Sequence, residues 1–423
     1  MWENIRFIRT IRGQKMNFRG ALEIKKQDNI VMKMIDFDEP IERRGTDCFK
    51  WDALPSMYGR DDLLPMWVAD MDFRSPDFVL DAIKQRCDHP VLGYTMPSEG
   101  YWNAVTSWLK RRYEIETTKE QLHFIPGIVA GIAYALLALT QPGDKVLVTT
   151  PVYPPFLNLP KGSERTLVCS PLKIENGRFA FDFDDFERKA KGCKMFIMSN
   201  PHNPAGTVWG REVLQRVADI CQRNKIIVVS DEIHADLTLP PHKHISYSTV
   251  SDAAKTNSLT FMAPSKTFNI AGLGSSTCYV ADDALRKRFF GWLDTMGVAG
   301  GNIFAFAGAE AAFANGEEWL AQMLDYLKEN VRFLDDFLKE RLPLVKSVLP
   351  EASYLAWLDF GAYGMSHKEL SDKLINEARV VLNDGTTFGG EKYECCFRIN
   401  LGCPRSMLKE GLERIEKMVN GEK

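Results

Sequence analysis

Residues 225–231 read KIIVVSD, and residues 194–199 read KMFIMS. Both runs are short and apolar and contain β-branched residues, a pattern typical of strands that are buried on both faces of a parallel sheet. Between them, residues 212–223 predict an amphipathic crossover helix, which is the connection that parallel strands require. The sequence therefore predicts an α/β protein built on a parallel sheet.

Polar side chains follow the carboxyl ends of these two strands. Asn203 lies in the turn NPHNPAG (residues 200–206), and Asp231 stands at the end of the later run. A third residue, Lys266 in APSKTFN (residues 263–269), follows Asp231 by 35 positions. In open parallel sheets the ligand crevice lies outside the carboxyl ends of the strands, so Asn203 and Asp231 are expected to line one.

An amide, a carboxylate and a lysine in this order are the side chains that an enzyme with pyridoxal phosphate (PLP) as its cofactor needs. The lysine amine, here Lys266, bonds covalently to the aldehyde of the cofactor and later moves protons at the α-carbon of the substrate. A carboxylate beside the pyridine nitrogen, here Asp231, favours the protonated form of that nitrogen by Coulomb attraction. The Asn203 amide can donate to the negatively charged 3-oxygen of the ring.

Each of these residues also has an ordinary interpretation when it is taken alone. A lysine after a serine is most often a solvated surface residue, and an aspartate at a strand end is often the cap of a turn or helix. An Asn-Pro pair commonly starts a turn. The order of the three residues and their placement at strand ends together favour the cofactor hypothesis, which the structural context has to test.

The composition describes a globular protein of mixed charge. The chain has 423 residues, of which 45% are hydrophobic and 26% are charged, and its formal net charge is −3. Neither a nucleic-acid surface nor a membrane span nor a signal peptide is expected. The nine cysteines have no Cys-x-x-Cys spacing and are expected to be reduced thiols of a cytoplasmic protein. No metal site is expected.

The sequence predicts two domains after a basic N-terminal extension. The expected parts are a disordered extension at residues 1–33, a segment at 34–75 that packs with the small domain, a large PLP-binding domain at 76–314, and a small α+β domain at 315–423. An upstream start codon in the gene, with Met32 or Met34 as the working start, explains the first residues equally well.

Three motifs carry a family resemblance. MWVADMDF at residues 66–73, KWD at residues 50–52 and NPHNP at residues 200–204 resemble the MalY/PatB group of cystathionine β-lyases. That group belongs to the fold-type I, aspartate-aminotransferase-like PLP enzymes, and the resemblance covers nearly all of residues 34–420. It implies a mostly parallel seven-stranded sheet between helices, a smaller α+β domain, PLP as the cofactor and a homodimer as the assembly.

The resemblance also assigns cofactor contacts. It puts the cofactor phosphate on the free backbone amides of Ile128 and Val129 at a helix start, and on the Ser265 hydroxyl. It puts the ring of Tyr153 flat on the cofactor. An ordinary core helix and a merely buried tyrosine are the alternatives, and spacing alone does not exclude them.

Further assignments concern the substrate and a second subunit. Tyr94 resembles a catalytic tyrosine that reaches across a dimer interface to the phosphate of the neighbour. Arg398 stands in an otherwise apolar run and resembles the residue that binds the substrate α-carboxylate, with Asn203 and Ala69 beside it. An arginine on an edge strand that reaches solvent is the alternative for Arg398.

The chain departs from the wider superfamily at three places. His234 stands where many relatives have a tyrosine, as in the MalY/PatB group, and it either contacts the cofactor or only packs. Gly274 replaces a phosphate-binding arginine of many relatives. Residues 294–302 lack the arginine that dicarboxylate-specific aminotransferases use, so aspartate and glutamate are not the expected substrates.

The leading hypothesis is a carbon–sulfur lyase. It would cleave a small amino-acid substrate, L-cystathionine or a related cysteine S-conjugate, by α,β-elimination to a thiol, pyruvate and ammonia. An aminotransferase uses the same residues up to the loss of the α-proton, so the motifs around Lys266 do not separate the two activities. A third hypothesis, which the resemblance to this group also implies, is a regulator that contacts a transcription factor. No residue of the chain encodes a surface for such a contact.

Overall fold

A computed structural model describes residues 34–421 of the protein, and residues from Ile35 onward form one compact unit. Its centre is a seven-stranded sheet. The strand order is β2 (Leu122–Ile125), β10 (Ser276–Tyr279), β9 (Ser258–Met262), β8 (Ile227–Asp231), β7 (Cys193–Ser199), β3 (Lys145–Thr150) and β4 (Thr166–Pro171). Only β10 runs antiparallel to its neighbours among these strands, so the predicted mostly parallel sheet is confirmed.

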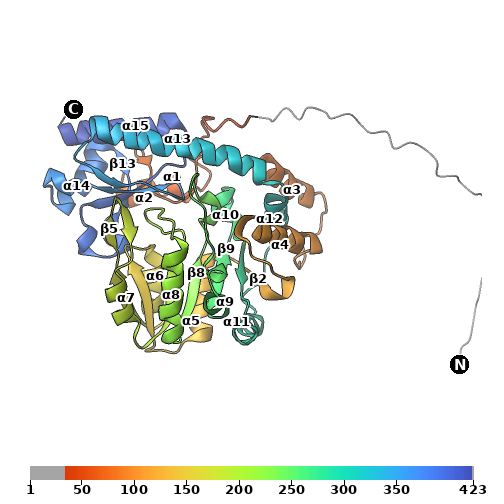
Figure 1. The fold of residues 1–423 in the computed structure, drawn as a ribbon. Helices are drawn as coiled ribbons and strands as arrows, with labels where there is room; N and C mark the ends of the chain where they lie inside the picture. Colours follow the sequence, from red (N-terminus) through yellow and green to blue (C-terminus); the bar gives the residue numbers. More distant parts are fainter. Residues whose placement is uncertain (1–33, 422–423) are drawn as a thin grey trace, which may run out of the picture. The chain divides into compact units, whose positions relative to one another are not determined.

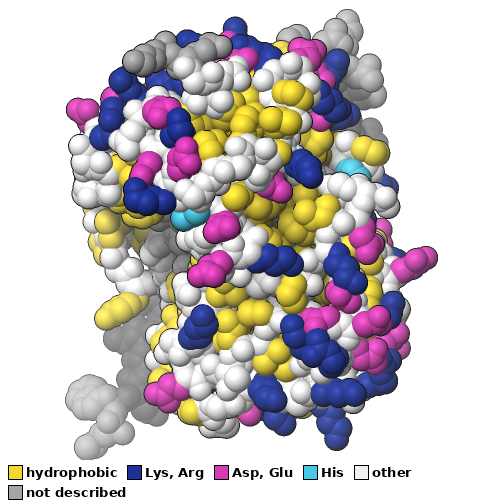
Figure 2. Space-filling view, turned by 90° about the vertical axis from the view of Figure 1, so that its left-hand side faces the viewer, with side chains coloured by type: hydrophobic (Ala, Val, Ile, Leu, Met, Phe, Trp, Pro, Cys, Tyr) yellow, Lys and Arg dark blue, Asp and Glu magenta, His cyan; other side chains and the backbone are white. Residues whose placement is uncertain are grey.

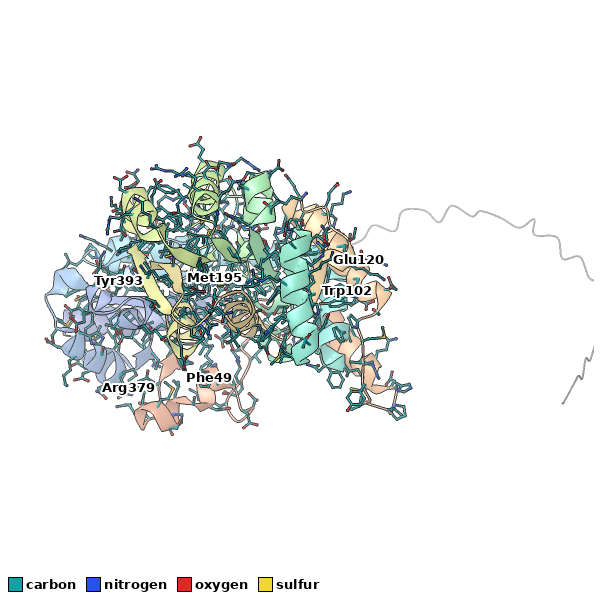
Figure 3. The ribbon with its side chains drawn as sticks, turned by 90° about the horizontal axis from the view of Figure 1, so that it is seen from below. Phe49, Trp102, Glu120, Met195, Arg379 and Tyr393 are labelled. Atoms are coloured by element: carbon teal, nitrogen blue, oxygen red, sulfur yellow. The ribbon has the colours of Figure 1, made fainter. Side chains whose placement is uncertain are left out.

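Strand β7 shows why its sequence is apolar without alternation. Met195 and Ile197 lie in one buried cluster, whereas Phe196 and Met198 lie in another. Successive side chains point to opposite faces of a sheet, and here both faces are covered. In Figure 3 the labelled Met195 lies in the interior of the molecule, among the strands of this sheet.

Helices cover both faces of the seven-stranded sheet. The cluster that holds Met195 also takes residues of α5 (Ile128–Leu139), α6 (Pro154–Gly162) and α11 (Asp283–Met296). The cluster that holds Phe196 takes residues of α7 (Phe183–Ala190), α8 (Arg211–Arg223) and α9 (Asp252–Thr256). Helix α8 is the predicted crossover helix, and it begins one residue earlier than the sequence indicated. Helices α3 (Asp77–Cys87), α4 (Glu99–Tyr113) and α12 (Ile303–Asn315) share a further cluster.

A second, antiparallel sheet lies in the C-terminal part of the chain. Its order is β11 (Lys346–Val348), β12 (Leu355–Asp359), β15 (Cys396–Asn400) and β14 (Asn383–Asp384). Helices α14 (His367–Lys373) and α15 (Arg405–Asn420) pack in the same cluster as this sheet. Because β15 has a partner strand on each side, Arg398 does not lie on an edge strand.

Helix α13 (Glu317–Arg341) connects the two regions. Trp319 and Leu320 in its first half pack in the cluster that contains Phe268, whereas Leu334 and Phe337 in its second half pack with the C-terminal sheet. In Figure 1 this helix runs from the region of α14 and α15 toward α3 and α12.

The N-terminal segment of the described chain contacts both regions. It contains α1 (Phe49–Asp52), α2 (Leu54–Tyr58) and β1 (Leu64–Pro65), and β1 pairs in parallel with β13 (Val380–Val381). Phe37 and Phe73 pack with the first half of α13. The domain boundaries stay a prediction, and the extension predicted at residues 1–33 lies outside the described residues.

The remaining elements are short. A hairpin is formed by β5 (Lys173–Glu175) and β6 (Arg178–Ala180), and α10 (Pro264–Thr267) follows β9. On the face drawn in Figure 2, basic and acidic side chains are interspersed and neither sign forms a separate patch. Within residues 34–421 no helix is both long enough and apolar enough to span a membrane.

Candidate active site

The sheet brings Asn203 and Asp231 to the same edge. Asp231 is the last residue of β8, and its register partner is Ser199, the last residue of β7. The Ser199 hydroxyl accepts a hydrogen bond from the Asn203 backbone N–H at 3.1 Å, which fixes the start of the turn that follows β7. Both predicted site residues are buried at the carboxyl ends of parallel strands, where ligands bind in such sheets.

The Asp231 carboxylate is buried without a cationic partner within ion-pair distance among residues 34–421. It accepts one hydrogen bond, from the Ile233 backbone N–H at 3.1 Å. Burial raises the pKa of Asp231 to about 7, and the Glu232 charge adds to this, whereas the Ile233 N–H and the Lys266 charge oppose it. A positively charged ring nitrogen beside this carboxylate would stabilise its ionised form.

Lys266 lies on the short helix α10, directly after β9. Its Nζ donates a hydrogen bond to the Ala69 carbonyl oxygen at 2.6 Å. Burial lowers the pKa of Lys266 to about 8, with the Arg398 charge in the same direction, while Asp70 and Asp231 oppose the change. A substantial neutral fraction of this amine near pH 8 suits both covalent bonding and proton transfer.

The turn that carries Lys266 is anchored on both sides by residues that the sequence did not single out. The Thr267 hydroxyl donates to Asp236 Oδ2 at 3.0 Å, and the Trp108 indole donates to the same buried carboxylate at 3.2 Å. On the other side, the Asn269 amide donates to the carbonyl oxygens of Met71 and Phe73 at 2.9 and 2.8 Å. These bonds hold the lysine backbone in place against the segment that follows β1.

Arg398 is a buried cation whose protein partners are all neutral. Its Nη1 donates to Asn203 Oδ1 at 3.0 Å, and its Nη2 donates to the Trp67 carbonyl at 3.0 Å and to Asn383 Oδ1. Its Nε has no partner in the described chain, and no acidic side chain there forms an ion pair with it. The guanidinium lies over the Phe388 ring, 5.1 Å from its centroid.

This environment makes Arg398 an anion site. Burial lowers the pKa of its guanidinium to about 10, because its neutral partners and the opposing effect of Tyr153 and Tyr354 compensate only part of the lost hydration of the charge. A carboxylate offers the planar, bidentate partner that such a group needs. Asn203 offers its oxygen to Arg398, which leaves its amide nitrogen as a donor toward the same site.

Two further predicted residues lie in the electrostatic field of this site. His234 is buried, and its Nδ1 has no hydrogen-bond partner in the part of the chain that the structure describes. Burial lowers the pKa of His234 to about 3, helped by the charges of Lys266 and Arg398, so the imidazole is neutral. Tyr153 directly precedes α6, after β3. Burial raises the pKa of its hydroxyl, and the charge of Asp231 adds to this while that of Arg398 opposes it.

The predicted phosphate ligands stand at a helix start and beside the lysine. Ile128 and Val129 are the first two residues of α5, and no side chain caps this helix, so its first amides have no intrahelical partner. Helix α5 begins directly beyond β2, at the same edge of the sheet as the other site residues. Ser265 is partly exposed on α10, next to Lys266. The assignment of the phosphate to these groups stays a prediction.

Tyr94 is the predicted residue that the single chain does not bring to the site. It is fully exposed, in the irregular segment between α3 and α4. The hydrophobic side chains of Val91, Leu92 and Met96 in the same segment are exposed as well. In Figure 3 this orange segment projects from the rest of the ribbon beyond Trp102.

Tyr354 is a site residue that the sequence did not reveal. Its hydroxyl donates to the Ala69 carbonyl oxygen at 3.0 Å, the same atom that accepts from Lys266. In the sequence Tyr354 only opens an apolar run that predicts a strand, and nothing there distinguishes it from a core residue. Ala69, predicted to contact the substrate, is thus placed beside the lysine by its backbone oxygen.

The residues present fit PLP. An unpaired buried carboxylate, a buried amine of lowered pKa and free helix amides are the groups that a pyridinium, an aldehyde and a phosphate require. The described residues hold no cluster of three or more histidine, cysteine or acidic side chains suited to a metal ion. The carboxylate, the amine and the helix amides are together the groups that bind the pyridine nitrogen, the aldehyde and the phosphate of PLP.

Comparisons with known proteins agree with this geometry. The family model for aminotransferase class I and II matches residues 65–415. The chain is 42% identical over 386 residues to cystathionine beta-lyase PatB of Bacillus subtilis, covering 90% of this chain and 99% of that protein. The resemblance to the MalY/PatB group is thereby confirmed.

Two solved structures are also similar. A PLP-bound putative aminotransferase from Clostridium difficile is 40% identical with a TM-score of 0.89, covering 91% of this chain and 100% of that one. A PLP-bound C–S lyase from Staphylococcus hominis is 35% identical with a TM-score of 0.84, covering 91% of this chain and 98% of that one. The chain therefore belongs to the aminotransferase class I and II family.

Proposed function

We propose that the protein is a PLP-dependent carbon–sulfur lyase that cleaves L-cystathionine or a related cysteine S-conjugate by α,β-elimination. The observation that carries this proposal is the buried Arg398 guanidinium, which has only neutral partners in the described chain and acts electrostatically on the Lys266 amine. It is suited to hold an amino acid by its α-carboxylate beside a lysine. The similarity to a cystathionine beta-lyase over nearly its whole length selects elimination as the reaction.

The side chains of the site can hold the cofactor in one orientation. Asp231 would pair with the pyridine nitrogen of bound PLP, Asn203 and His234 would lie on the side of its 3-oxygen, and Tyr153 would cover its ring. The amides of Ile128 and Val129 and the Ser265 hydroxyl would bind its phosphate. When bound, PLP supplies an electron sink for the charge that develops at the substrate α-carbon.

The reaction follows from the positions of Arg398 and Lys266. Arg398 binds the α-carboxylate, with Asn203 and Ala69 beside it, and so directs the α-hydrogen toward Lys266. The Lys266 amine takes the α-proton and becomes an ammonium group. The bond between the β-carbon and sulfur then breaks, its electron pair leaves with sulfur, and Lys266 can return a proton to the departing thiolate. Hydrolysis of the remaining three-carbon unit gives pyruvate and ammonia.

A product assay tests this proposal against transamination. The purified protein with added PLP is incubated with cystathionine in the absence of any keto acid, and pyruvate and free thiol are measured. Equal amounts of both products are expected, and none with Lys266→Ala. Amino transfer that depends on an added keto acid, without pyruvate or thiol from cystathionine, would instead establish an aminotransferase.

We further propose that two copies of the chain form the working enzyme. The hydrophobic side chains of Val91, Leu92 and Met96, close to Tyr94 in the sequence, are exposed like Tyr94 itself among the residues that the structure describes. A second copy covers this segment, and Tyr94 supplies its hydroxyl to the phosphate in the site of that copy. A symmetric dimer then contains two complete sites.

Mixing two inactive variants tests the exchange of Tyr94. Tyr94→Ala and Lys266→Ala subunits are each expected to give nearly inactive dimers. After equal amounts are unfolded and refolded together, half of the dimers are hybrids, and each hybrid contains one site with both Lys266 and a partner Tyr94. Activity should therefore return to about a quarter of the wild-type value. A mixture that stays as inactive as its components would show that Tyr94 does not serve the neighbouring site.

We infer a reducing compartment, the cytoplasm, from the cysteines. None of the nine forms a disulfide, and Cys193, Cys221, Cys278 and Cys403 are buried in the core as thiols. Burial raises the pKa of each of these four, which keeps them unreactive. Lyase activity in the cytoplasmic fraction of lysed cells would support this location, and activity confined to a secreted or membrane fraction would contradict it.

A further inference from the structure

The segment from Trp67 to Met71 is held by its backbone oxygens as well as by its side chains, since Trp67 and Met71 are buried and the Asp70 carboxylate pairs with Arg43. Each of its five consecutive carbonyl groups accepts a hydrogen bond from a side chain elsewhere in the chain. The donors come from the N-terminal segment, from the lysine turn and from the C-terminal sheet, and they are Arg43, Lys50, Lys266, Asn269, Tyr354, Arg398 and Asn400. The position of this segment is therefore set by three parts of the fold at once.

Within this segment the Ala69 carbonyl differs from the others, because its two donors are both titratable groups of the site. Lys266 Nζ lies 2.6 Å from the oxygen and Tyr354 Oη lies 3.0 Å from it. A carbonyl oxygen has two lone pairs, so these two donors use its full accepting capacity. The amine and the hydroxyl share one acceptor, and the strength of one bond depends on the other.

Tyr354 is well placed to act on Lys266 and poorly suited to transfer protons itself. It is fully buried, with its ring edge toward His234 at a centroid distance of 6.4 Å. Burial raises the pKa of its hydroxyl far above the ordinary value, and the Asp70 charge adds to this while Arg398 opposes it. A hydroxyl that stays protonated cannot protonate a thiolate, whose ordinary pKa is about 8.5, so that proton is left to Lys266.

We propose that Tyr354 is a positioning residue for Lys266, and that it acts by sharing the Ala69 carbonyl with the lysine amine. The hydroxyl occupies one lone pair and so limits how tightly the carbonyl holds the charged form of the amine. Without it, the carbonyl binds the ammonium group more strongly than the neutral amine, and the amine gives up its proton less readily. This role rests on the proposed function, in which Lys266 must be neutral to take the α-proton.

The apoprotein offers a test that does not depend on catalysis. The rate at which an amine-acylating reagent modifies Lys266 is measured by mass spectrometry at a series of pH values, because only the neutral amine reacts. Wild-type apoprotein should show a midpoint close to the pKa of about 8 of this amine. Tyr354→Phe should move the midpoint upward by about 0.5 to 1 pH unit, since one hydrogen bond to a charged group becomes stronger.

The other charges that face Lys266 stay in place in this variant. They are Asp70 on the segment after β1, Asp231 at the end of β8 and Arg398 on β15. Tyr247→Phe is the matched control, because Tyr247 is also fully buried but packs in the cluster of α8, whereas Tyr354 packs in the cluster of α4 and α12. This control should leave the Lys266 midpoint unchanged.

The outcomes separate positioning from a structural role and from failure of the proposed activity. A folded Tyr354→Phe protein whose midpoint equals that of the wild type would overturn the proposal. If this variant does not fold, Tyr354→Met gives the same test, because methionine fills the site with a flexible apolar side chain that cannot donate a hydrogen bond to the Ala69 carbonyl. In the holoenzyme the acid limb of kcat should move to higher pH by the same amount with KM unchanged. Absence of lyase activity in every form would reject the proposed function and leave the apoprotein midpoint to decide the role of Tyr354.

Discussion

At the scale of single residues, burial decides the chemistry of this site more than pairing does. The pKa of Asp231 is raised, and the pKa values of Lys266, His234 and Arg398 are lowered, each mainly because the charged form loses its hydration. Among residues 34–421, none of the four has an oppositely charged side chain within ion-pair distance. Other charges act on them only over longer distances. Burial therefore disfavours the charged form of each group in the apoprotein, and a ligand of opposite charge would favour the charged forms of Asp231, Lys266 and Arg398.

Asp231→Asn should stabilise the apoprotein at neutral pH and weaken its hold on the cofactor. In the unfolded chain Asp231 ionises near pH 3.8, whereas in the folded apoprotein its pKa is about 7. The folded state thus keeps a proton that the unfolded state has lost, and apoprotein stability falls as the pH rises from about 4 to about 7. The difference between the two pKa values corresponds to a loss of at most about 4 kcal/mol in the free energy of unfolding above pH 7. The Asp231→Asn variant avoids this loss, because asparagine does not ionise.

Urea unfolding of wild-type and Asp231→Asn apoprotein at pH 4 and pH 8 measures this effect. The two proteins should differ little at pH 4, and the variant should be more stable at pH 8. With PLP present the order should reverse, because the amide does not favour a protonated ring nitrogen. If the stability of both apoproteins depended on pH in the same way, burial would not raise the pKa of the Asp231 carboxylate.

At the scale of elements, the turn after β7 of the seven-stranded sheet contacts the segment between β11 and β12 of the C-terminal sheet. Gly206, in the turn after β7, has a positive φ of 66°, and its carbonyl accepts from the backbone N–H groups of Glu351 and Ala352. A Cβ added there would lie 2.0 Å from the Ala352 carbonyl oxygen. Both the backbone conformation and the close approach require glycine at this position.

Gly206→Ala should therefore destabilise the protein by about 3 kcal/mol or more, because the strain of a left-handed alanine is added to a contact that only a backbone shift relieves. The measurement is the midpoint of thermal or urea unfolding. Gly210→Ala is the control, since Gly210 has open space around its Cα and an ordinary φ of −72°. A Gly206→Ala protein as stable as the control would mean that this turn is free to move.

The elements were largely predictable from the sequence, and the contacts between them were not. The uninterrupted apolar runs gave β7 and β8 because both faces of the sheet are covered, and the predicted helix α8 follows from its own periodicity. Asn203, Asp231 and Lys266 were found from their order in the chain and from the placement of Asn203 and Asp231 after strand ends, and Arg398 was found as a charged residue in an apolar run. Tyr354 was not found, since a tyrosine in an apolar run carries no such signal and its partner is a backbone oxygen.

At the scale of the whole molecule, two cores are joined around one site. Helix α13 packs in both cores, while Lys266 comes from the turn after β9 and Arg398 from the C-terminal sheet. A ligand that contacts both residues bridges the two regions. Ligand binding should therefore be visible in the stability of the entire unit rather than of one part.

Addition of PLP to the apoprotein should raise the temperature of a single unfolding transition. A ligand that binds only the folded state adds about 2.7 kcal/mol at a hundred times its dissociation constant. Differential scanning calorimetry at increasing PLP measures this. Pyridoxal without phosphate should give a smaller rise in the unfolding temperature, because the amides at the start of α5 have no phosphate to bind. The Lys266→Ala variant should keep only the part of the rise that comes from non-covalent binding of PLP. An unchanged transition in the wild type would rule out PLP as the ligand.

The run of carbonyl acceptors from Trp67 to Met71 has a consequence for anyone who tries to engineer this enzyme. Side-chain replacements at these five positions remove none of the acceptor atoms, but they disturb the buried Trp67 and Met71 side chains and the ion pair between Asp70 and Arg43. Libraries aimed at the distant donors, such as Asn269 or Asn400, would reach the same segment from outside, at positions where amino-acid identity alters its geometry.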